Sequence, residues 1–511
     1  MMGEKENARK FTLDVGWATL SLLAMMAVGF ILSIVLGNFF DAAGLGAYSM
    51  VLTVWTIASL TAGIGIPMAV IKFVAEYVDR PKICNSIISS SMLLGTVSGL
   101  AVTAVLFLTS DIIEGYMNIP NLGHLLRIVS FSFPFIVNNE IFLGALNAYR
   151  EMKVFAALEI FRRGGILFIT LILVWLGMGV AGAVIALVIA PALTTLMILF
   201  IHGKYFKFGL FNTRRTLGKI TKFGGQLYAA SSIGIINSHA ATLLIGFYLT
   251  DSDVGIYAVA LMFFNAMMLI PHAIQKITYP AFATHIAKKR NALIKKMMRF
   301  TMQFSLIMMS VACLILVFYY DDIIGLIFPG KEAFLMAVEP LILLAIVGVP
   351  FGVIVPVGAI LISAGRADLS LKITIVQAIV NIGMAMFLIP LSLNLFGFQL
   401  GGLNGAAIAL GANFIVGLVF TFALLTPVLK IRMNFTKLHI GLGIFFMFLL
   451  AGLALAHFTG LDGNLVGAII LPLFVLCLYL AKVLSRDLVL MVLQLVRKDK
   501  KSAPRPSREC P

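Results

Sequence analysis

Charged residues are scarce in this 511-residue chain: Asp, Glu, Lys and Arg make up 12% of it, and hydrophobic residues make up 61%. The mean hydropathy is strongly positive. One soluble core of this length has too little interior to hide so much apolar surface. The composition therefore excludes an ordinary soluble protein and indicates a chain that lives in a lipid bilayer.

Cysteine is also rare. The four cysteines are Cys84, Cys313, Cys477 and Cys510, and their spacing matches no metal or redox motif. Two of them fall in predicted cytoplasmic segments and two in predicted spans, so we expect thiols and no disulfides. No metal site and no cofactor are predicted.

The strand-like alternation of a membrane barrel is absent. Instead, apolar runs of roughly 20 residues or more recur along the chain, which favours a helical bundle over a barrel. Fourteen such runs lie near residues 13–37, 47–71, 86–109, 123–146, 155–176, 180–201, 223–248, 254–283, 299–319, 335–363, 370–391, 403–427, 437–457 and 464–484. The first run is too long for the core of a cleaved signal peptide and is interpreted as a retained helix. We predict an all-α polytopic membrane protein with fourteen transmembrane helices.

Positive charge is nearly missing from every second connecting segment. With the N-terminus in the cytoplasm, 35 of the 38 Lys and Arg residues lie on the inner side, and only Arg127, Lys276 and Lys331 lie elsewhere. This bias predicts a multi-pass protein of the plasma membrane with both termini cytoplasmic. The net charge of +16 is then explained by orientation and by contact with anionic lipid headgroups, and no nucleic acid partner is predicted.

The chain contains an internal repeat. GVAGAVIALVIA at residues 179–190 resembles GLNGAAIALGAN at 402–413, and residues 36–48 resemble residues 245–257. Because order and direction are preserved, we predict two parallel six-helix lobes, related by an axis along the membrane normal. The predicted units are an N-terminal lobe (1–201), a basic cytoplasmic connector (202–222), a C-terminal lobe (223–428), two additional transmembrane helices (429–485) and a basic cytoplasmic tail (486–511). Duplicated bundles commonly carry a substrate path between their lobes, although a duplicated static scaffold is the alternative.

Several short segments carry a family resemblance. LGAY at 45–48, GIGIP at 63–67, KFVAE at 72–76, VGIY at 254–257 and GLNGAA at 402–407 are similar in order and spacing to segments of the oligosaccharide flippases in the multidrug/oligosaccharidyl-lipid/polysaccharide exporter superfamily. The resemblance implies two lobes around a central cavity and two extra C-terminal helices. It also implies a transporter that moves an oligosaccharide, linked to polyprenyl phosphate or diphosphate, from the inner to the outer leaflet. The implied partners are this anionic glycan lipid and membrane lipids, with glycan-assembly enzymes as further candidates.

Two other functions stay open. Ion-coupled multidrug efflux on the same fold would want several carboxylates inside one lobe, and only Glu140 and Asp14 qualify. A membrane enzyme acting on lipid-linked glycans would need a large outer loop with catalytic groups, but the predicted outer loops are short. We expect no enzymatic activity.

The run near 254–283 holds the first candidate binding residues. Asn265, His272 and Lys276 are spaced so that they share one face of a helix. A lysine there can bind the phosphate of the cargo, with the other two as hydrogen-bonding companions. The alternatives are a Lys276 that snorkels to the inner surface and a His272 that only packs.

The run near 123–146 supplies the remaining candidates. Arg127 and Asn138 share a face, and Arg127 lies near the predicted outer surface. Arg127 either holds an outer-leaflet phosphate or pairs with an acid such as Asp111. Glu140 is the best candidate for coupling to a proton or sodium ion, with a hydrogen bond to a neighbouring span as the alternative.

Two adjacent arginines begin the next run, near 155–176. Arg162 and Arg163 follow Glu159 at what we expect to be the inner interface. They can steer an anionic headgroup into the cavity, or they can anchor the helix against lipid phosphates, which is the commoner role.

Overall fold

The computed structural model describes residues 16–17, 24–209, 213–395, 398–429 and 435–484. This described part is almost entirely helical. Its only strands, β1 (Asn394–Leu395) and β2 (Phe398–Gln399), form an antiparallel pair in which Asn394 lies opposite Gln399. The predicted tail 486–511, with Cys510, and Asp14 lie outside the described residues.

Helices follow one another closely along the described part of the chain. A helix at Ala24–Phe39 comes first. The others in the first half are α2 (Ala42–Gly63), α3 (Ile66–Glu76), α4 (Pro81–Tyr116), α5 (Leu122–Ser130), α6 (Phe133–Ala148), α7 (Met152–Trp175), α8 (Gly179–Ile201), the short 3-10 helix η1 (His202–Lys204) and α9 (Thr213–Tyr248). The second half contains α10 (Asp251–Ala287), α11 (Asn291–Phe318), α12 (Tyr320–Ile327), η2 (Glu332–Ala337), α13 (Val338–Ser363), α14 (Ala367–Leu388), α15 (Gly402–Leu429), α16 (Thr436–Thr459) and α17 (Gly463–Leu480).

Within the described residues, each predicted apolar run overlaps a helix, and the runs near 47–71 and 123–146 are each divided between two helices. Not every helix is long and apolar enough to count as a span. Ten helices of the described part meet that standard, or eleven if α5 and α6, which meet at a bend of 46°, form one broken span. The helix α7 falls short because four charged residues lie in its first half. The structure thus shows a polytopic membrane fold with ten or eleven apolar spans, and the count of fourteen stays a prediction.

The contacts divide the chain into two compact units. Unit 1 contains Met1–Phe263, Ile324–Leu344 and Thr374–Asn413, and unit 2 contains Phe264–Ile323, Ala345–Ile373 and Phe414–Pro511. The boundary passes through five helices: α10, α12, α13, α14 and α15. The segment predicted as a connector, 202–222, contains η1 and the beginning of α9.

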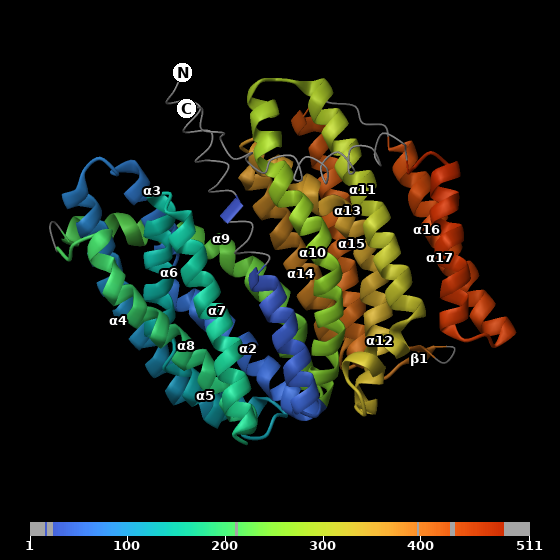
Figure 1. Ribbon diagram of the computed structural model, residues 1–511, viewed down its shortest axis with the longest axis horizontal. Coiled ribbons are helices and arrows are strands. Elements are labelled where there is room, and N and C mark those ends of the chain that lie inside the picture. Colours follow the sequence, from blue (N-terminus) through green and yellow to red (C-terminus); the bar gives the residue numbers. More distant parts are fainter. Residues whose placement is uncertain (1–15, 18–23, 210–212, 396–397, 430–434, 485–511) are drawn as a thin grey trace, which may run out of the picture. The chain divides into compact units, whose positions relative to one another are not determined.

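In unit 1, α4, α6, α7 and α8 run side by side (Figure 1). Small residues let these helices approach one another, as expected for helices in lipid. A side chain on Gly99 of α4, for example, would place its Cβ 2.8 Å from the Cα of Pro134 on α6. At the bend before α6, Trp55 Nε1 donates a hydrogen bond to Ser132 Oγ at 2.8 Å, which ties α2 to this corner.

Two glycine contacts join α9 and α10 to the N-terminal helices of unit 1. Gly46 on α2 lies against the backbone of α10, and Gly255 on α10 lies against the backbone of α2. Gly65, which has a left-handed φ of 67°, lies against the carbonyl of Gly224 on α9. A Cβ atom at any of these positions would collide with a backbone atom, so only glycine fits.

Unit 2 is held together by aromatic and small residues. The ring of Phe414 stacks between Phe264 and Phe351, with centroid distances of 5.5 and 4.1 Å. Gly441 and Gly452 on α16 face Leu306 and Phe318 of α11. These contacts attach the predicted additional helices, α16 and α17, to α11.

Candidate functional site

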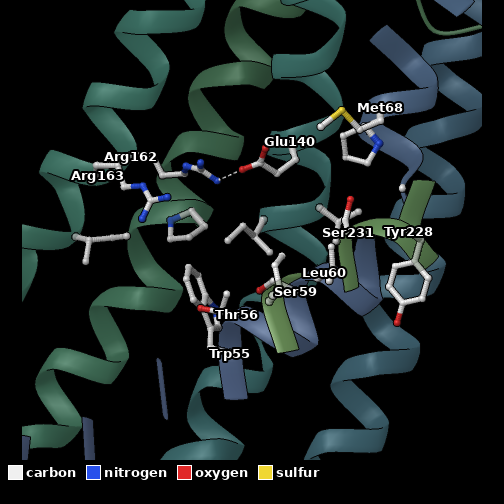
Figure 2. A pocket seen from close by; sticks show the side chains of 18 residues that line it. Trp55, Thr56, Ser59, Leu60, Met68, Glu140, Arg162, Arg163, Tyr228 and Ser231 are labelled. Carbon is white, nitrogen blue, oxygen red and sulfur yellow. Dashed lines mark ion pairs between the residues drawn. The ribbon is translucent and has the colours of Figure 1, made fainter. Parts of the chain in front are cut away.

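Unit 1 encloses a cavity of about 320 Å³. It lies among α2, α3, α6, α7, α8 and α9, and every residue that lines it belongs to unit 1. Figure 2 shows Arg162 and Arg163 on one side of the cavity and Tyr228 and Ser231 on the other. We call this space the unit 1 cavity.

Most of the cavity wall is apolar, with hydroxyl groups at intervals. Leu60, Met68, Ile136 and Ile166 are among the apolar residues. The lining hydroxyls come from α2 and α9: Thr56, Ser59, Tyr228 and Ser231. The Ser59 hydroxyl is buried and has no hydrogen-bond partner among the described residues. An apolar wall with a few polar groups is typical of a ligand pocket, and hydroxyls suit a sugar.

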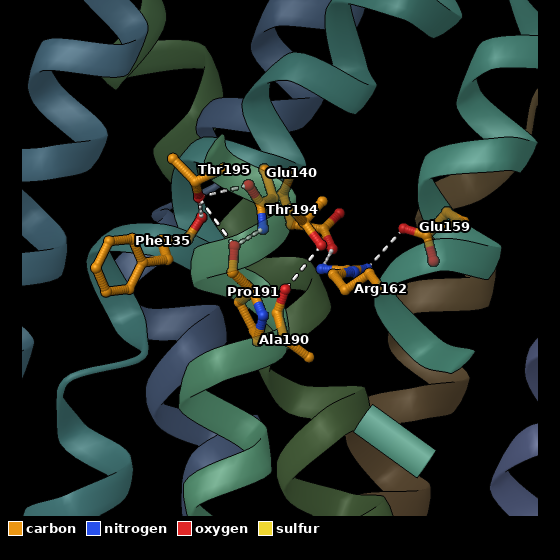
Figure 3. A network of polar contacts seen from close by, with 9 residues as sticks. Phe135, Glu140, Glu159, Arg162, Ala190, Pro191, Thr194 and Thr195 are labelled. Atoms are coloured by element: carbon orange, nitrogen blue, oxygen red, sulfur yellow. Dashed lines mark hydrogen bonds and ion pairs between the residues drawn. The ribbon is translucent and has the colours of Figure 1, made fainter. Parts of the chain in front are cut away.

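Three charged side chains line the cavity: Glu140 from α6, and Arg162 and Arg163 from α7. Arg162 is held between two carboxylates (Figure 3). Its Nη1 lies 2.7 Å from Glu140 Oε1, and its Nη2 lies 2.6 Å from Glu159 Oε1. The side chains of Arg162 and Glu159 are each 5% exposed, whereas that of Glu140 is 45% exposed. The buried charges of Arg162 and Glu159 are tolerated only because they form an ion pair.

The neighbouring arginine has no such partner. Arg163 is exposed in the cavity, and no described residue forms a hydrogen bond or ion pair with it. A guanidinium offers five donors in a planar fork that fits a phosphate or carboxylate. Arg163 is therefore the group of the unit 1 cavity that can receive an anion directly.

A second hydrogen-bond network, which includes Pro191 and Thr195 (Figure 3), holds the residue before Glu140. Asn139, the preceding residue, donates to the Pro191 carbonyl at 3.0 Å, and Thr195 Oγ1 donates to Asn139 Oδ1 at 2.8 Å. Asn139 is completely buried. These contacts fasten α6 to α8 and fix the position from which Glu140 reaches Arg162.

The predicted outer arginine lies elsewhere in unit 1. Arg127 pairs with Asp111 and donates from Nε to Ser110 Oγ at 3.0 Å. It does not line the unit 1 cavity. The pairing with an acid is one of the two alternatives that the sequence left open, and a role of Arg127 in phosphate binding stays a prediction.

Asn138 also lies outside the cavity wall. Its Nδ2 donates to Thr96 Oγ1 and to the Pro134 carbonyl, both at 2.8 Å, which connects α6 to α4. Its Oδ1 is buried and has no partner among the described residues. Of the three candidates in this part of the chain, only Glu140 lines the cavity.

The other predicted stripe is on α10, in unit 2. Asn265 and Lys276 are exposed, and His272 is half-buried. Neither Asn265 nor Lys276 has a hydrogen bond or ion pair with a described residue. The exposure of the stripe agrees with polar side chains that face away from the packed interior of unit 2, but a role in cargo binding stays a prediction.

The sequence favours lipid anchoring for the two arginines of α7, whereas both line the unit 1 cavity. The spacing of Glu159 and Arg162, three residues apart in an apolar helix, was the available signal for an internal ion pair. The lining hydroxyls of α2 and α9 were missed, because Ser, Thr and Tyr are common in membrane helices and gave no distinct pattern.

Comparison with known proteins gives a consistent family assignment. Residues 11–286 match the profile of the family described as polysaccharide biosynthesis protein. The chain is 23% identical over 420 residues to the lipopolysaccharide biosynthesis protein WzxC of Escherichia coli, covering 81% of this chain and 80% of that protein. It is 22% identical over 281 residues to the succinoglycan biosynthesis transport protein ExoT of Rhizobium meliloti, covering 54% of each.

The fold also has a counterpart among solved structures. The lipid II flippase MurJ, in an inward closed conformation, aligns with a TM-score of 0.71 at 15% sequence identity. The alignment covers 92% of this chain and 99% of MurJ. At this identity the likeness concerns the fold alone.

Proposed function

We propose that this chain, which belongs to the polysaccharide biosynthesis protein family, is a flippase that moves a lipid-linked oligosaccharide across the membrane. The cargo is an oligosaccharide on polyprenyl phosphate or diphosphate. It enters from the inner leaflet and leaves to the outer leaflet, in the assembly of a cell-surface glycan. The relatives named for lipopolysaccharide biosynthesis and succinoglycan transport support this assignment.

The observation that carries the proposal is Arg163 in the wall of the unit 1 cavity. The guanidinium is exposed there and forms no hydrogen bond or ion pair with a described residue. A phosphate-bearing headgroup would supply the missing anion, and the hydroxyls of Thr56, Ser59 and Ser231 would face its sugars. The lipid chain needs no such groups, because it can remain in the hydrocarbon of the bilayer.

We also propose the finer architecture of fourteen spans in two parallel lobes with two additional C-terminal helices. The reciprocal contact of Gly46 and Gly255 supports it, because both glycines occupy the same position in the two copies of the repeat. Rocking of one lobe against the other would open the path alternately to each side. Both termini then lie in the cytoplasm of a plasma-membrane protein.

The polar stripe of α10 is proposed as a second contact for the cargo. Lys276 would bind phosphate, and His272 and Asn265 would form hydrogen bonds to the headgroup. The exposure of Asn265 and Lys276 supports this role. Glycan-assembly enzymes and membrane lipids are the proposed partners besides the cargo, and no chemical step is assigned to the protein.

Ion-coupled multidrug efflux is the second candidate function. The unit 1 cavity gives this function little support. Glu140 is the only carboxylate among the described residues that line the cavity, and it is paired with Arg162. A coupling role of Glu140 would require that this ion pair opens during transport.

Deletion of the gene tests the proposal. A flippase predicts that lipid-linked glycan accumulates on the inner leaflet of the deletion strain. Unchanged glycans with increased drug sensitivity would indicate the efflux transporter instead. Short glycans on the outer leaflet would indicate an enzyme that acts on lipid-linked glycans.

A further inference from the structure

Glu140 occupies an unusual position for a carboxylate in an anion-binding cavity. It lines the unit 1 cavity and is 45% exposed there, yet its Oε1 lies 2.7 Å from Arg162 Nη1. The second carboxylate of Arg162, that of Glu159, is buried and does not line the cavity. The cargo would therefore meet a glutamate already bound to one of the two cavity arginines.

The charges of this cluster can be counted from the contacts. Arg162 has two carboxylate partners, so these three side chains together carry one negative charge. Arg163, which forms no hydrogen bond or ion pair with a described residue, adds one positive charge and makes the four-residue cluster neutral. An anionic headgroup would thus find strong hydrogen-bond donors at Arg163 but no net positive charge in the cluster.

A neutral cluster should bind headgroups with one and with two negative charges with different affinities. Arg163 can form direct, charge-assisted hydrogen bonds to a phosphate with one negative charge. Within the unit 1 cavity, a second negative charge would lie next to the carboxylate of Glu140, and the described lining residues offer it no further unpaired cation. The Glu140 carboxylate would repel this added charge, so binding it is costly.

We propose that Glu140 determines the charge of the headgroup that the unit 1 cavity accepts, favouring a sugar linked through a single phosphate over one linked through a diphosphate. The sugar phosphodiester carries one negative charge and the sugar diphosphate carries two. This inference rests on the proposed function, because it concerns the headgroup of the same cargo. Glu140 acts as a specificity-determining residue.

The substitution Glu140→Gln isolates this effect. Glutamine has nearly the same shape, and its side-chain oxygen can still accept a hydrogen bond from Arg162. Arg162 also keeps its ion pair with Glu159. The cluster then gains one positive charge. Because an electrostatic energy is proportional to the charge of the ligand, the gain in binding free energy should be about twice as large for two ligand charges as for one.

The test uses the full chain, purified and reconstituted in lipid nanodiscs. Two probes share a farnesyl chain and N-acetylglucosamine and differ only in a phosphate or diphosphate linkage. Their dissociation constants are measured by isothermal titration calorimetry for the wild type, Glu140→Gln and Arg163→Gln. Glu76→Gln, an exposed position of α3 outside the cavity, is the matched control for the same loss of charge.

We expect the wild type and Glu76→Gln to prefer the monophosphate probe. We expect Glu140→Gln to lower the dissociation constant of both probes. The factor for the diphosphate probe should be about the square of the factor for the monophosphate probe. If both dissociation constants fall by the same factor, or if the wild type prefers the diphosphate probe, the proposed role of Glu140 is overturned and the proposed function is unaffected. If the folded wild type binds neither probe, or if Arg163→Gln binds both as well as the wild type, the proposed cavity function fails instead.

Discussion

Gly46 and Gly255 lie in reciprocal backbone contact. A Cβ atom on Gly46 would collide with the carbonyl oxygen of Asp251, and a Cβ atom on Gly255 would collide with that of Ala42. Asp251 lies four residues before Gly255, and Ala42 lies four residues before Gly46. The two contacts are therefore equivalent, as a local twofold relationship between α2 and α10 requires. The two glycines also correspond in the internal repeat, so the copies meet each other through the same residue.

This contact predicts that alanine is not tolerated at either glycine. Gly46→Ala and Gly255→Ala would each force α2 and α10 apart, and we expect a loss of about 1–3 kcal/mol of stability, as for other overpacked sites. Thermal unfolding of the purified protein in detergent measures the effect. Gly164→Ala on α7 is the control, because no atom lies within 4 Å of its added Cβ. Equal melting temperatures for all three variants would contradict the contact.

Removal of the buried arginine should destabilise the protein. Arg162→Ala leaves Glu159, 5% exposed, without its ion-pair partner, and breaking a buried pair in this way costs about 3 kcal/mol or more. We expect low yields of folded protein and an early thermal transition in fluorescence-detected size-exclusion chromatography.

A double variant separates this explanation from simple loss of packing. Arg162→Ala combined with Glu159→Gln removes the uncompensated charge, and so the double variant should be more stable than Arg162→Ala alone. If the second substitution gives no recovery, the ion pair with Glu159 is not what holds this part of α7.

Lys276→Ala tests the proposed role of the α10 stripe. We expect slower translocation of an anionic lipid-linked cargo in vesicles, with no loss of folded protein, because Lys276 is exposed and forms no hydrogen bond or ion pair with a described residue. Lys288→Ala is the control, since Lys288 is an exposed lysine just beyond the end of α10. Full activity of Lys276→Ala would assign this lysine to snorkelling at the membrane surface.

Much of the fold could be predicted from hydropathy and from the repeat. The apolar runs coincide with helices because a helix satisfies its own backbone in lipid. The roles of Arg162 and Arg163 could not be separated in this way. Adjacent residues project about 100° apart on a helix, and the sequence does not say which direction meets a neighbouring helix and which meets a cavity. The structure places Arg162 against Glu140 and Glu159 and leaves Arg163 facing the cavity.

The alternatives left open for Glu140 and Arg127 show the same limit. Each has an ion-pair partner in the structure, Arg162 for Glu140 and Asp111 for Arg127. Partners on other helices depend on how the helices pack, and the spacing of charges within one helix does not contain that information. Asn138, which bonds to Thr96 on α4, is a third case.

Translocation by the Arg163→Gln variant is the most direct test of the account. The protein is reconstituted in vesicles with a lipid-linked oligosaccharide that bears a fluorophore on its sugar, and a membrane-impermeant quencher reports its movement between leaflets. We expect the wild type and the control Lys153→Gln, an exposed position of the same helix, to move the lipid. Arg163→Gln should be about tenfold slower or worse, as the loss of a charged hydrogen bond implies. Movement by Arg163→Gln at the wild-type rate, or no movement by the folded wild type, would contradict the account.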